Sequence, residues 1–374
     1  MLFADPRFVA LTALTWIVFT VANRRWRPTV LAAGGVVFYL LLAPSDATVI
    51  LGLAAAVFLV PRRFGAAAAL GVAATLIAFK IKSSADSTSA IPLGLSFLAF
   101  ELMHLAIDRE SWAPEQPTAD VFAAWALFFP CRVSGPIRRF PDFASSLLAA
   151  DPSLSDVYFG LVRTLQGLAK KFVLADVLAM TVAEGIGIPT AVQAWKVLVA
   201  FTFQIYLDFS AYSDIAIGVT RMFGIKAPEN FDWPYLSRNI KEFWTRWHIT
   251  LSLWIRDYVF IGVGRMAFGT PLRSSPTSVA CLCYIVSFVT VGAWHGLAPH
   301  YLVWGLYQGA LLSGYHVYRR TLGDRLARSP VYSSPVINAL STALTFVAVM
   351  VGYVFFLSAD MHSALTMFGR LVGR

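Results

Sequence analysis

Charged residues are scarce in this chain. Asp, Glu, Lys and Arg make up 14% of its 374 residues, against about 25% in an ordinary soluble domain, and none of the four occurs from Ser274 to Tyr318. The hydrophobic fraction is 57% and the mean hydropathy is +0.65. This balance excludes a soluble globular protein and predicts an all-α, polytopic integral membrane protein. The chain can hold roughly nine to eleven transmembrane helices, with re-entrant or amphipathic helices beside them. We expect a single integral membrane domain over residues 1–374.

Cysteine is also rare, with three in the chain. Cys281 and Cys283 form a Cys-x-Cys pair on different faces of an apolar segment, and Cys131 lies far from them in sequence. A structural zinc site takes four ligands, and no second pair of ligands accompanies this one. The sequence therefore predicts packing cysteines and no metal.

Several motifs are absent. The chain has no Gly-x-Ser-x-Gly nucleophile elbow, no internal repeat and no low-complexity linker. The apolar segment Phe8–Ala22 is followed by Asn23-Arg-Arg-Trp-Arg27 without a small-residue cleavage site. We therefore expect a retained first helix with a basic end instead of a cleaved signal peptide.

Acidic residues are outnumbered, which leaves a formal charge of +9 and a pI near 9.6. The basic residues sit in short clusters between apolar runs, as the positive-inside bias and anionic lipid headgroups produce. This placement predicts contact with membrane lipid and no nucleic-acid binding. One hydrophilic loop, Asp108–Asp120, stands apart from this pattern. The basic clusters are Arg24, Arg25 and Arg27; Arg62 and Arg63; Lys170 and Lys171; and Arg319, Arg320, Arg325 and Arg328.

A two-faced helix is predicted from Ile240 to about Tyr258, after the helix-breaking segment Lys226–Ser237. Asn239 with Glu242 matches a capping box, and Glu242 with Arg246 has the spacing of an ion pair. An interfacial amphipathic helix explains this pattern by itself. Histidine is the member of the polar face that titrates near neutrality. The apolar face carries Phe243, Trp247, Leu251, Trp254 and Tyr258, and the polar face carries Lys241, Thr245, His248, Ser252 and Arg256.

Polar side chains also gather upstream in an apolar context, and buried carboxylates there need partners. Arg221 follows Asp214 by seven residues and can share its helix face. Structural hydrogen bonds between helices explain this cluster, and cation binding by two carboxylates is the alternative. The cluster consists of Asp208, Ser210, Tyr212, Ser213 and Asp214.

His295 lies in Val291-Gly-Ala-Trp-His-Gly296, inside the charge-free stretch, which is long enough for two membrane-crossing helices. Gly292, Gly296 and Pro299 predict a helix break or a close backbone approach beside it. An imidazole in an apolar span is a candidate functional group, although it can instead serve an interhelical hydrogen bond. A neutral imidazole that removes a hydroxyl proton during attack on a carbonyl contributes about a hundred- to ten-thousand-fold. A thioester is reactive enough that this chemistry needs no covalent enzyme intermediate.

A series of specific blocks resembles one protein family in order and content, from Ile91 to about Gly309. The blocks are Pro92–Phe97, Ile107–Arg109, Gly135–Arg138, Leu207–Gly218, Pro228–Ser237, Glu242–Ser252, Trp254–Tyr258, Trp294–Gly296 and Trp304–Tyr307. On these blocks the chain resembles the membrane-bound O-acyltransferases, in particular the branch that acetylates alginate or transfers D-alanine to teichoic acids.

The resemblance implies helices around a central tunnel, which a cytoplasmic acyl donor enters from one side and the acceptor from the other. His295 corresponds to the family's catalytic histidine, acting as general base or proton relay, and His248 to its second histidine. Further candidates for lining the tunnel or supporting these two are Asp208, Tyr212, Asp214, Trp244, Arg246, Ser252, Arg256 and Trp294.

The resemblance also implies a reaction and its partners. The expected acyl group is acetyl, from acetyl-CoA or an acyl-carrier thioester, with no bound cofactor. The acceptor is a hydroxyl of a cell-envelope polysaccharide or exopolysaccharide, reached by analogy through an extracytoplasmic acyl-esterase-like acetyltransferase partner. The expected location is the bacterial inner membrane. The alternatives are a transporter or lipid flippase, with Asp208 and Asp214 at a midplane site, and a non-catalytic component of an envelope polysaccharide system.

Overall fold

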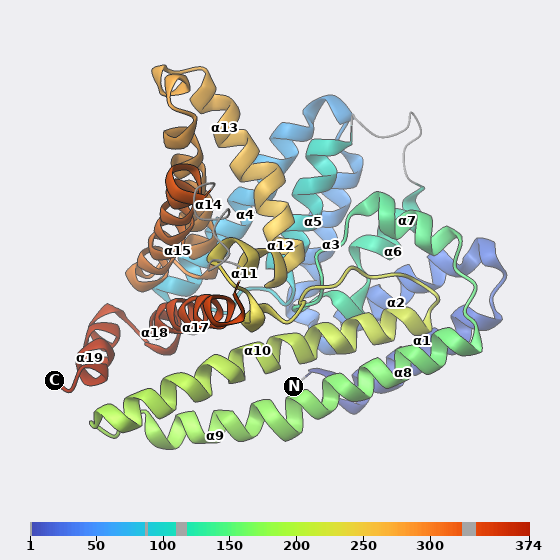
Figure 1. The fold of residues 1–374 in the computed structure, drawn as a ribbon. Helices are drawn as coiled ribbons and strands as arrows, with labels where there is room; N and C mark the ends of the chain where they lie inside the picture. The colour runs from blue at the N-terminus through green and yellow to red at the C-terminus, as the bar shows by residue number, and fades with distance from the viewer. Residues whose placement is uncertain (1, 87–88, 110–117, 324–333) are drawn as a thin grey trace. The chain divides into compact units, whose positions relative to one another are not determined.

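The computed structural model describes residues 2–86, 89–109, 118–323 and 334–374 (Figure 1). Within these ranges the chain is helical, and the one β contact is an isolated antiparallel bridge between Phe231 and Trp247. The predicted all-α fold is confirmed. Residues 110–117 of the predicted hydrophilic loop lie outside the described residues, as do Arg325 and Arg328 of the last basic cluster.

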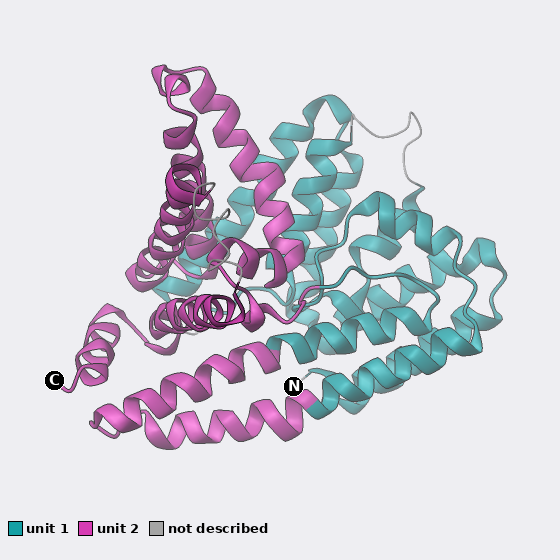
Figure 2. Ribbon diagram, viewed as in Figure 1, with its two compact units in different colours: residues 1–169, 209–229 teal, residues 170–208, 230–374 magenta. Residues whose placement is uncertain are grey.

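The chain forms two compact units (Figure 2). The first consists of residues 1–169 and 209–229, and the second of residues 170–208 and 230–374. The boundary falls twice in helical segments, so the long helix α10 (Ala191–Met222) contributes to both units. A single integral domain stays a prediction.

The first predicted apolar segment is helical and forms α1 in the first unit, while its retention stays a prediction. The helix is capped by Asp5, whose side chain accepts from the Arg7 backbone N–H. Proline begins several helices in this chain, because its fixed φ suits the first turn and its missing N–H is not needed there. The helices of this unit are α1 (Pro6–Val21), α2 (Arg27–Leu42), α3 (Pro44–Leu59), α4 (Gly65–Ala85), α5 (Leu95–Asp108), α6 (Ala119–Ala126), α7 (Phe140–Leu148), α8 (Leu154–Ala169) and the end of α10.

Glycines let α8 pack directly on the end of α10. A Cβ added to Gly160 would lie 2.5 Å from the carbonyl oxygen of Gly218, and one added to Gly218 would lie 2.5 Å from that of Gly160. Two backbones this close leave no room for any side chain. The small residues therefore bring the polar residues of α8 within reach of those on α10.

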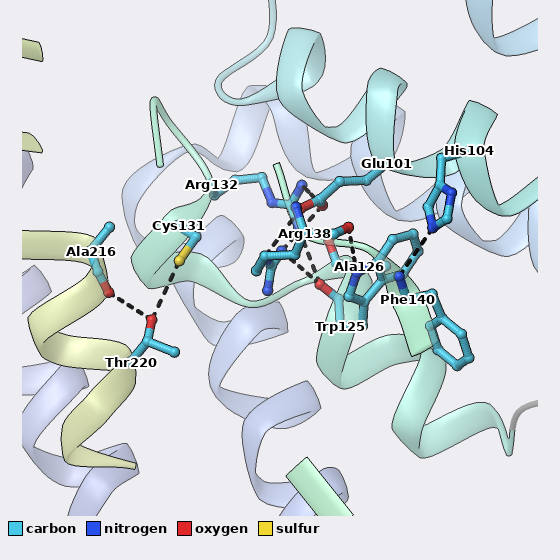
Figure 3. A network of polar contacts seen from close by, with 10 residues as sticks. All are labelled: Glu101, His104, Trp125, Ala126, Cys131, Arg132, Arg138, Phe140, Ala216 and Thr220. Carbon is cyan, nitrogen blue, oxygen red and sulfur yellow. Dashed lines mark hydrogen bonds and ion pairs between the residues drawn. The ribbon is translucent and has the colours of Figure 1, made fainter. Parts of the chain in front are cut away.

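The core of the first unit holds a buried charged cluster (Figure 3). Glu101 is 2% exposed, and its carboxylate accepts from Arg132 at 2.9 Å and from Arg138 at 3.0 and 3.1 Å. Arg138 also donates to the Trp125 carbonyl at 2.9 Å. Buried charges persist when they are paired and hydrogen-bonded in this way. The Gly135–Arg138 block therefore ties the loop after α6 to α5.

The second unit carries the long hairpin of α14 and α15. Its helices are α9 (Asp176–Gly185), the start of α10, α11 (Ile240–Arg246), α12 (Ile249–Ile255), α13 (Ile261–Phe268), α14 (Pro276–His295), α15 (Pro299–Tyr318), α17 (Pro335–Gly352), α18 (Val354–Leu357) and α19 (Met361–Leu371). Short π-helical turns at Lys170–Ala175, Arg256–Phe260 and Arg319–Gly323 continue α8, α12 and α15.

Three described helical segments are long and apolar enough to cross a membrane: Arg62–Ala85, Pro276–His295 and Pro335–Leu357. The helices Pro6–Val21, Pro44–Leu59 and Ala119–Cys131 are apolar but shorter. Helices tilted or buried among others can be shorter than an upright span. The count of nine to eleven crossings and the central tunnel stay predictions.

The charge-free stretch forms two 20-residue helices, α14 and α15, which lie side by side (Figure 1). Gly292 and Gly305 make this contact possible, because a Cβ on either would lie 2.3 Å from a carbonyl oxygen of the other helix. The two helices and the break beside His295 are present as predicted: α14 ends at His295 and α15 begins at Pro299. Of the two, α14 is among the apolar segments long enough to cross a membrane and α15 is not, so a membrane crossing by α15 stays a prediction.

Candidate functional site

The polar helix predicted from Ile240 to Tyr258 is broken, and the break is at His248. α11 ends at Arg246, and α12 begins at Ile249, while His248 adopts φ 44° and ψ 54°. The break arises because residues 230–232 pair with this segment. The Asp232 N–H donates to the Arg246 carbonyl at 3.0 Å, and the Ile249 N–H donates to the Asn230 carbonyl at 3.0 Å. The prediction of one continuous helix was wrong. The periodicity of residues within a segment gives no information about backbone hydrogen bonds to another part of the chain, here residues 230–232.

His248 does not lie on an exposed polar face. It is 3% exposed, and its Nδ1 lies 3.1 Å from Oδ1 of Asn230, which is fully buried. Thr250 donates to the same oxygen from its hydroxyl at 2.8 Å. Burial of the imidazole, reinforced by the nearby His295, lowers the pKa of His248 below the usual value for histidine. The ring is therefore neutral at pH 7.

His295 is the last residue of α14 and is exposed. The sequence placed it in the middle of a charge-free stretch, whereas the structure places it at the tip of a hairpin. Its ring centroid lies 5.4 Å from that of Trp304 and 4.8 Å from that of Phe356, edge-to-face in both cases. Tyr301 stacks at 6.4 Å. The imidazole therefore packs against three aromatic rings while the residue as a whole stays exposed.

Trp294 joins the two histidines. Its ring centroid lies 6.4 Å from that of His248 and 4.6 Å from that of His295. The structure thus brings together three of the predicted site residues from two separate parts of the chain, the turn before α12 and the end of α14. All three belong to the second unit.

Trp244 connects this group to the interior of the same unit. Its indole N–H donates to Oε1 of Gln308 at 3.3 Å, and its ring lies 4.6 Å from Phe288 and 6.1 Å from Trp304. Trp304 in turn contacts His295. The rings of Trp304 and Trp244 therefore separate His295 from a cavity, and Trp244 forms part of the wall of that cavity.

That cavity has a volume of about 320 Å³ and a mostly apolar wall. A second cavity of about 360 Å³ shares Lys241 and Tyr284 with it and adds Tyr315, His316 and Arg319. An apolar chamber thus adjoins a basic one within the second unit. The first cavity is lined by Lys241, Trp244, Thr245, Ile249, Leu251, Ser252, Leu253, Ile255, Arg256, Phe260, Tyr284, Ser287, Phe288, Val291 and Leu312.

The remaining predicted residues on α11 and α12 have local partners. Arg246 pairs with Glu242 at 2.8 Å, which confirms the predicted ion pair. Asn239 is confirmed as the N-cap, but Glu242 accepts from the Arg238 N–H and not from that of Asn239. Ser252 and Arg256 line the apolar cavity; the Ser252 hydroxyl donates to the Trp247 carbonyl at 3.3 Å, and Arg256 pairs with its neighbour Asp257.

The acidic residues of α10 form ion pairs. Asp208 accepts from Lys171 at 2.5 Å in the second unit. Asp214 accepts from Arg163 at 2.6 Å in the first unit, and Arg221, expected opposite it, pairs with Asp156 at 2.7 Å instead. The Tyr212 hydroxyl accepts from the Val133 N–H at 3.1 Å. This supports hydrogen bonding between helices, since α8 supplies Arg163. Among the described residues no group of three or more His, Cys, Asp or Glu side chains is placed to hold a metal ion.

Sequence reasoning missed three contributors to the site, namely Asn230, Trp304 and Phe356. Asn230 stands in the helix-breaking segment between Pro228 and Pro234, where a fully buried amide implies a specific partner. Trp304 belongs to a recognised block, and it lies within the first two turns of the helix that follows the break after His295. Phe356 had no distinguishing signal, because it lies in an apolar run far from both histidines.

The fold and this site define a helical membrane protein in which two histidines from separate segments meet on one indole beside an apolar chamber. The chain belongs to the membrane-bound O-acyltransferase family (MBOAT), whose sequence model matches residues 15–359.

Several bacterial proteins are similar to this chain. A probable alginate O-acetylase of Pseudomonas putida is 36% identical over 287 residues, covering 75% of this chain and 55% of the relative. A teichoic acid D-alanyltransferase of Streptococcus thermophilus is 28% identical over 303 residues, covering 75% of this chain and 72% of the relative. A peptidoglycan O-acetyltransferase of Helicobacter pylori is 33% identical over 262 residues, covering 67% of this chain and 46% of the relative. The chain thus spans about half the length of the alginate and peptidoglycan relatives.

Proposed function

We propose that this protein is a membrane O-acyltransferase that moves an acyl group from a thioester to a hydroxyl, with His295 as general base and His248 assisting. One observation carries the proposal: His248 and His295 lie against the same Trp294 ring, His248 buried and His295 exposed. Family membership supports it, because the relatives' names describe O-acetylation or D-alanylation.

The chemistry follows from the accessible imidazole. His295 takes the proton of an acceptor hydroxyl as its oxygen forms a bond to the thioester carbonyl carbon. Collapse of the tetrahedral intermediate breaks the carbon–sulfur bond, and the imidazolium returns the proton to the departing thiolate. An ester and a free thiol result. No serine or cysteine nucleophile is required.

The two adjoining cavities support a thioester donor such as acetyl-CoA or an acylated carrier protein. The uncharged part of such a donor suits the apolar chamber beside Trp244, and its phosphates carry negative charge. Lys241 and Arg319 line the second cavity together with His316. Cationic side chains beside an apolar chamber match such an amphiphilic donor. The acyl group that we propose is acetyl, as the names of the alginate and peptidoglycan relatives suggest.

The acceptor and its setting are part of the same proposal. The relatives act on alginate, teichoic acid or peptidoglycan by their names. We propose a polysaccharide hydroxyl of the bacterial envelope as final acceptor, an extracytoplasmic acyl-esterase-like partner that receives the acyl group, and a multi-pass location in the inner membrane. The apolar spans α4, α14 and α17 support the last point.

The proposal is tested with purified full-length protein in lipid nanodiscs and radiolabelled acetyl-CoA or acylated carrier protein. We expect His295→Ala to lower the rate of acyl release about a hundredfold or more. His362→Ala is the matched control, because His362 is an exposed histidine of α19 and lines a different cavity. Unchanged turnover in His295→Ala would remove the base assignment. If the wild-type protein released no acyl group but transported a solute, the function would be that of a transporter and not of an acyltransferase.

A further inference from the structure

A buried amide, that of Asn230, lies against the His248 ring. Asn230 is fully buried in the connection between α10 and the 3₁₀ turn Pro234–Leu236. Its backbone carbonyl accepts from the Ile249 N–H at 3.0 Å, so the pairing that breaks the polar helix also fixes the position of this side chain. Its amide oxygen faces His248 and Thr250 together.

The orientation of the amide follows from its neighbours. The Thr250 backbone N–H points at the Asn230 side chain, with 3.4 Å between nitrogen and Oδ1. A backbone N–H can donate but cannot accept, so the atom that it faces must be the oxygen. The Thr250 hydroxyl, at 2.8 Å, donates to the same oxygen. A flipped amide would set its NH₂ group against an N–H.

The orientation of the amide decides the tautomer of the imidazole. Oδ1 of Asn230 only accepts, and Nδ1 of His248 lies 3.1 Å from it. Nδ1 must therefore carry the proton. In a neutral ring Nε2 then holds a lone pair and is an acceptor.

We propose that Asn230 is a positioning residue that fixes His248 as the Nδ1–H tautomer, so that Nε2 holds the lone pair and acts only as a hydrogen-bond acceptor. Its catalytic meaning rests on the proposed function. In this tautomer His248 cannot polarise the thioester carbonyl, which would require an N–H. In this tautomer Nε2 can accept only from a group that carries a hydrogen.

Two further observations agree with this role. His248 holds a left-handed backbone conformation, with φ 44°, that residues with a side chain rarely adopt, and such strain persists where the surroundings fix it. Burial lowers the pKa of His248, so the ring keeps its lone pair without taking up a proton. Removal of the hydroxyl proton then belongs to the exposed His295.

The test reads the tautomer directly by ¹⁵N NMR of full-length protein labelled at histidine. Protonated and unprotonated imidazole nitrogens have distinct ¹⁵N resonances, and His248→Gln assigns the signal among the six histidines. We expect Nδ1–H in the wild type. Asn230→Ala removes the acceptor and should shift the ratio of the tautomers about five- to tenfold toward Nε2–H, with a similar loss in kcat. Asn338→Ala, a matched substitution elsewhere in the second unit, should change neither.

Asn230→Asp keeps the proposal testable if the alanine variant does not fold. A carboxylate also accepts from Nδ1–H, so the tautomer should be retained, and its charge should move the acid limb of the pH–rate profile to higher pH. An Nε2–H wild type, or a tautomer ratio unchanged in Asn230→Ala, would overturn the proposal. If the tautomer behaves as expected but the wild type transfers no acyl group, the positioning contact stands and the proposed function fails.

Discussion

Phe231 and Trp247 form an antiparallel bridge between two segments that the sequence presents as a loop and a helix. Their rings also meet edge-to-face, with centroids 5.1 Å apart. The bridge withdraws Trp247 from α11, and the turn that follows carries His248 inward instead of along the polar face. A contact 16 positions apart in the chain thus determines where the second histidine of the site points.

The left-handed backbone at His248 should be measurable as strain. We expect His248→Gly to be more stable than His248→Ala by about 1 kcal/mol, because glycine adopts positive φ without a Cβ clash. Both variants lose the same imidazole, so the difference isolates the backbone. Thermal unfolding of the two proteins in one detergent measures it. Equal stability would show that the turn relaxes to a negative φ.

Gly292 should tolerate no side chain. A Cβ there would lie 2.3 Å from the carbonyl oxygen of Tyr301, so Gly292→Ala should force α14 and α15 apart and destabilise the protein by about 1–3 kcal/mol. The shift would also displace His295 from Trp304 and lower turnover. Gly314→Ala is the control on the same hairpin, since no atom lies within 4 Å of its added Cβ. That variant should match or exceed the stability of the wild type, and equal losses in both would contradict the packing argument.

Lys241 and Arg319 should contribute to binding of the acyl donor more than to binding of the acceptor. If they bind donor phosphates, Lys241→Ala and Arg319→Ala should each raise KM for the acyl donor about tenfold at low salt, while kcat changes little. Steady-state kinetics with the donor varied measure this effect. Lys226→Ala, which removes an exposed lysine of the first unit, should leave KM unchanged. If the wild type and the three variants had equal KM values, the basic cavity would not be the binding site for the donor phosphates.

The Glu242–Arg246 ion pair should stabilise the protein without taking part in the reaction. Both side chains are partly exposed, so Arg246→Ala should cost a few tenths of a kcal/mol and lower the melting temperature slightly. Relative activity should be intact. A collapse of activity at unchanged stability would mean that Arg246 contacts the donor.

Much of the fold follows from local sequence. The charge-free stretch with Gly292, Gly296 and Pro299 predicted two helices and the break beside His295, and both are present. Asn239 and Glu242 predicted the start of α11 and its ion pair. These features depend on residues within a few positions of one another, which is the range over which helix signals act.

The rest depends on distant contacts. The break at His248 requires Phe231, and the burial of His248 requires Asn230, so no periodicity within Ile240–Tyr258 could reveal either. The carboxylate Asp214 had Arg221 as a neighbour in sequence, yet its partner is Arg163 on another helix. Helix spacing gives the residues that can meet on one helix, whereas the choice between partners is made by tertiary packing.

The glycine contacts between α14 and α15 have a consequence for how this protein can change over evolution. Because the two helices are in contact through their backbones, the position of the hairpin tip that carries His295 depends on backbone atoms and not on side chains. Side chains on the outer surface of the hairpin can therefore be exchanged for others suited to a different lipid without moving the reactive ring. A change at one of the glycines, by contrast, needs a matching change across the contact.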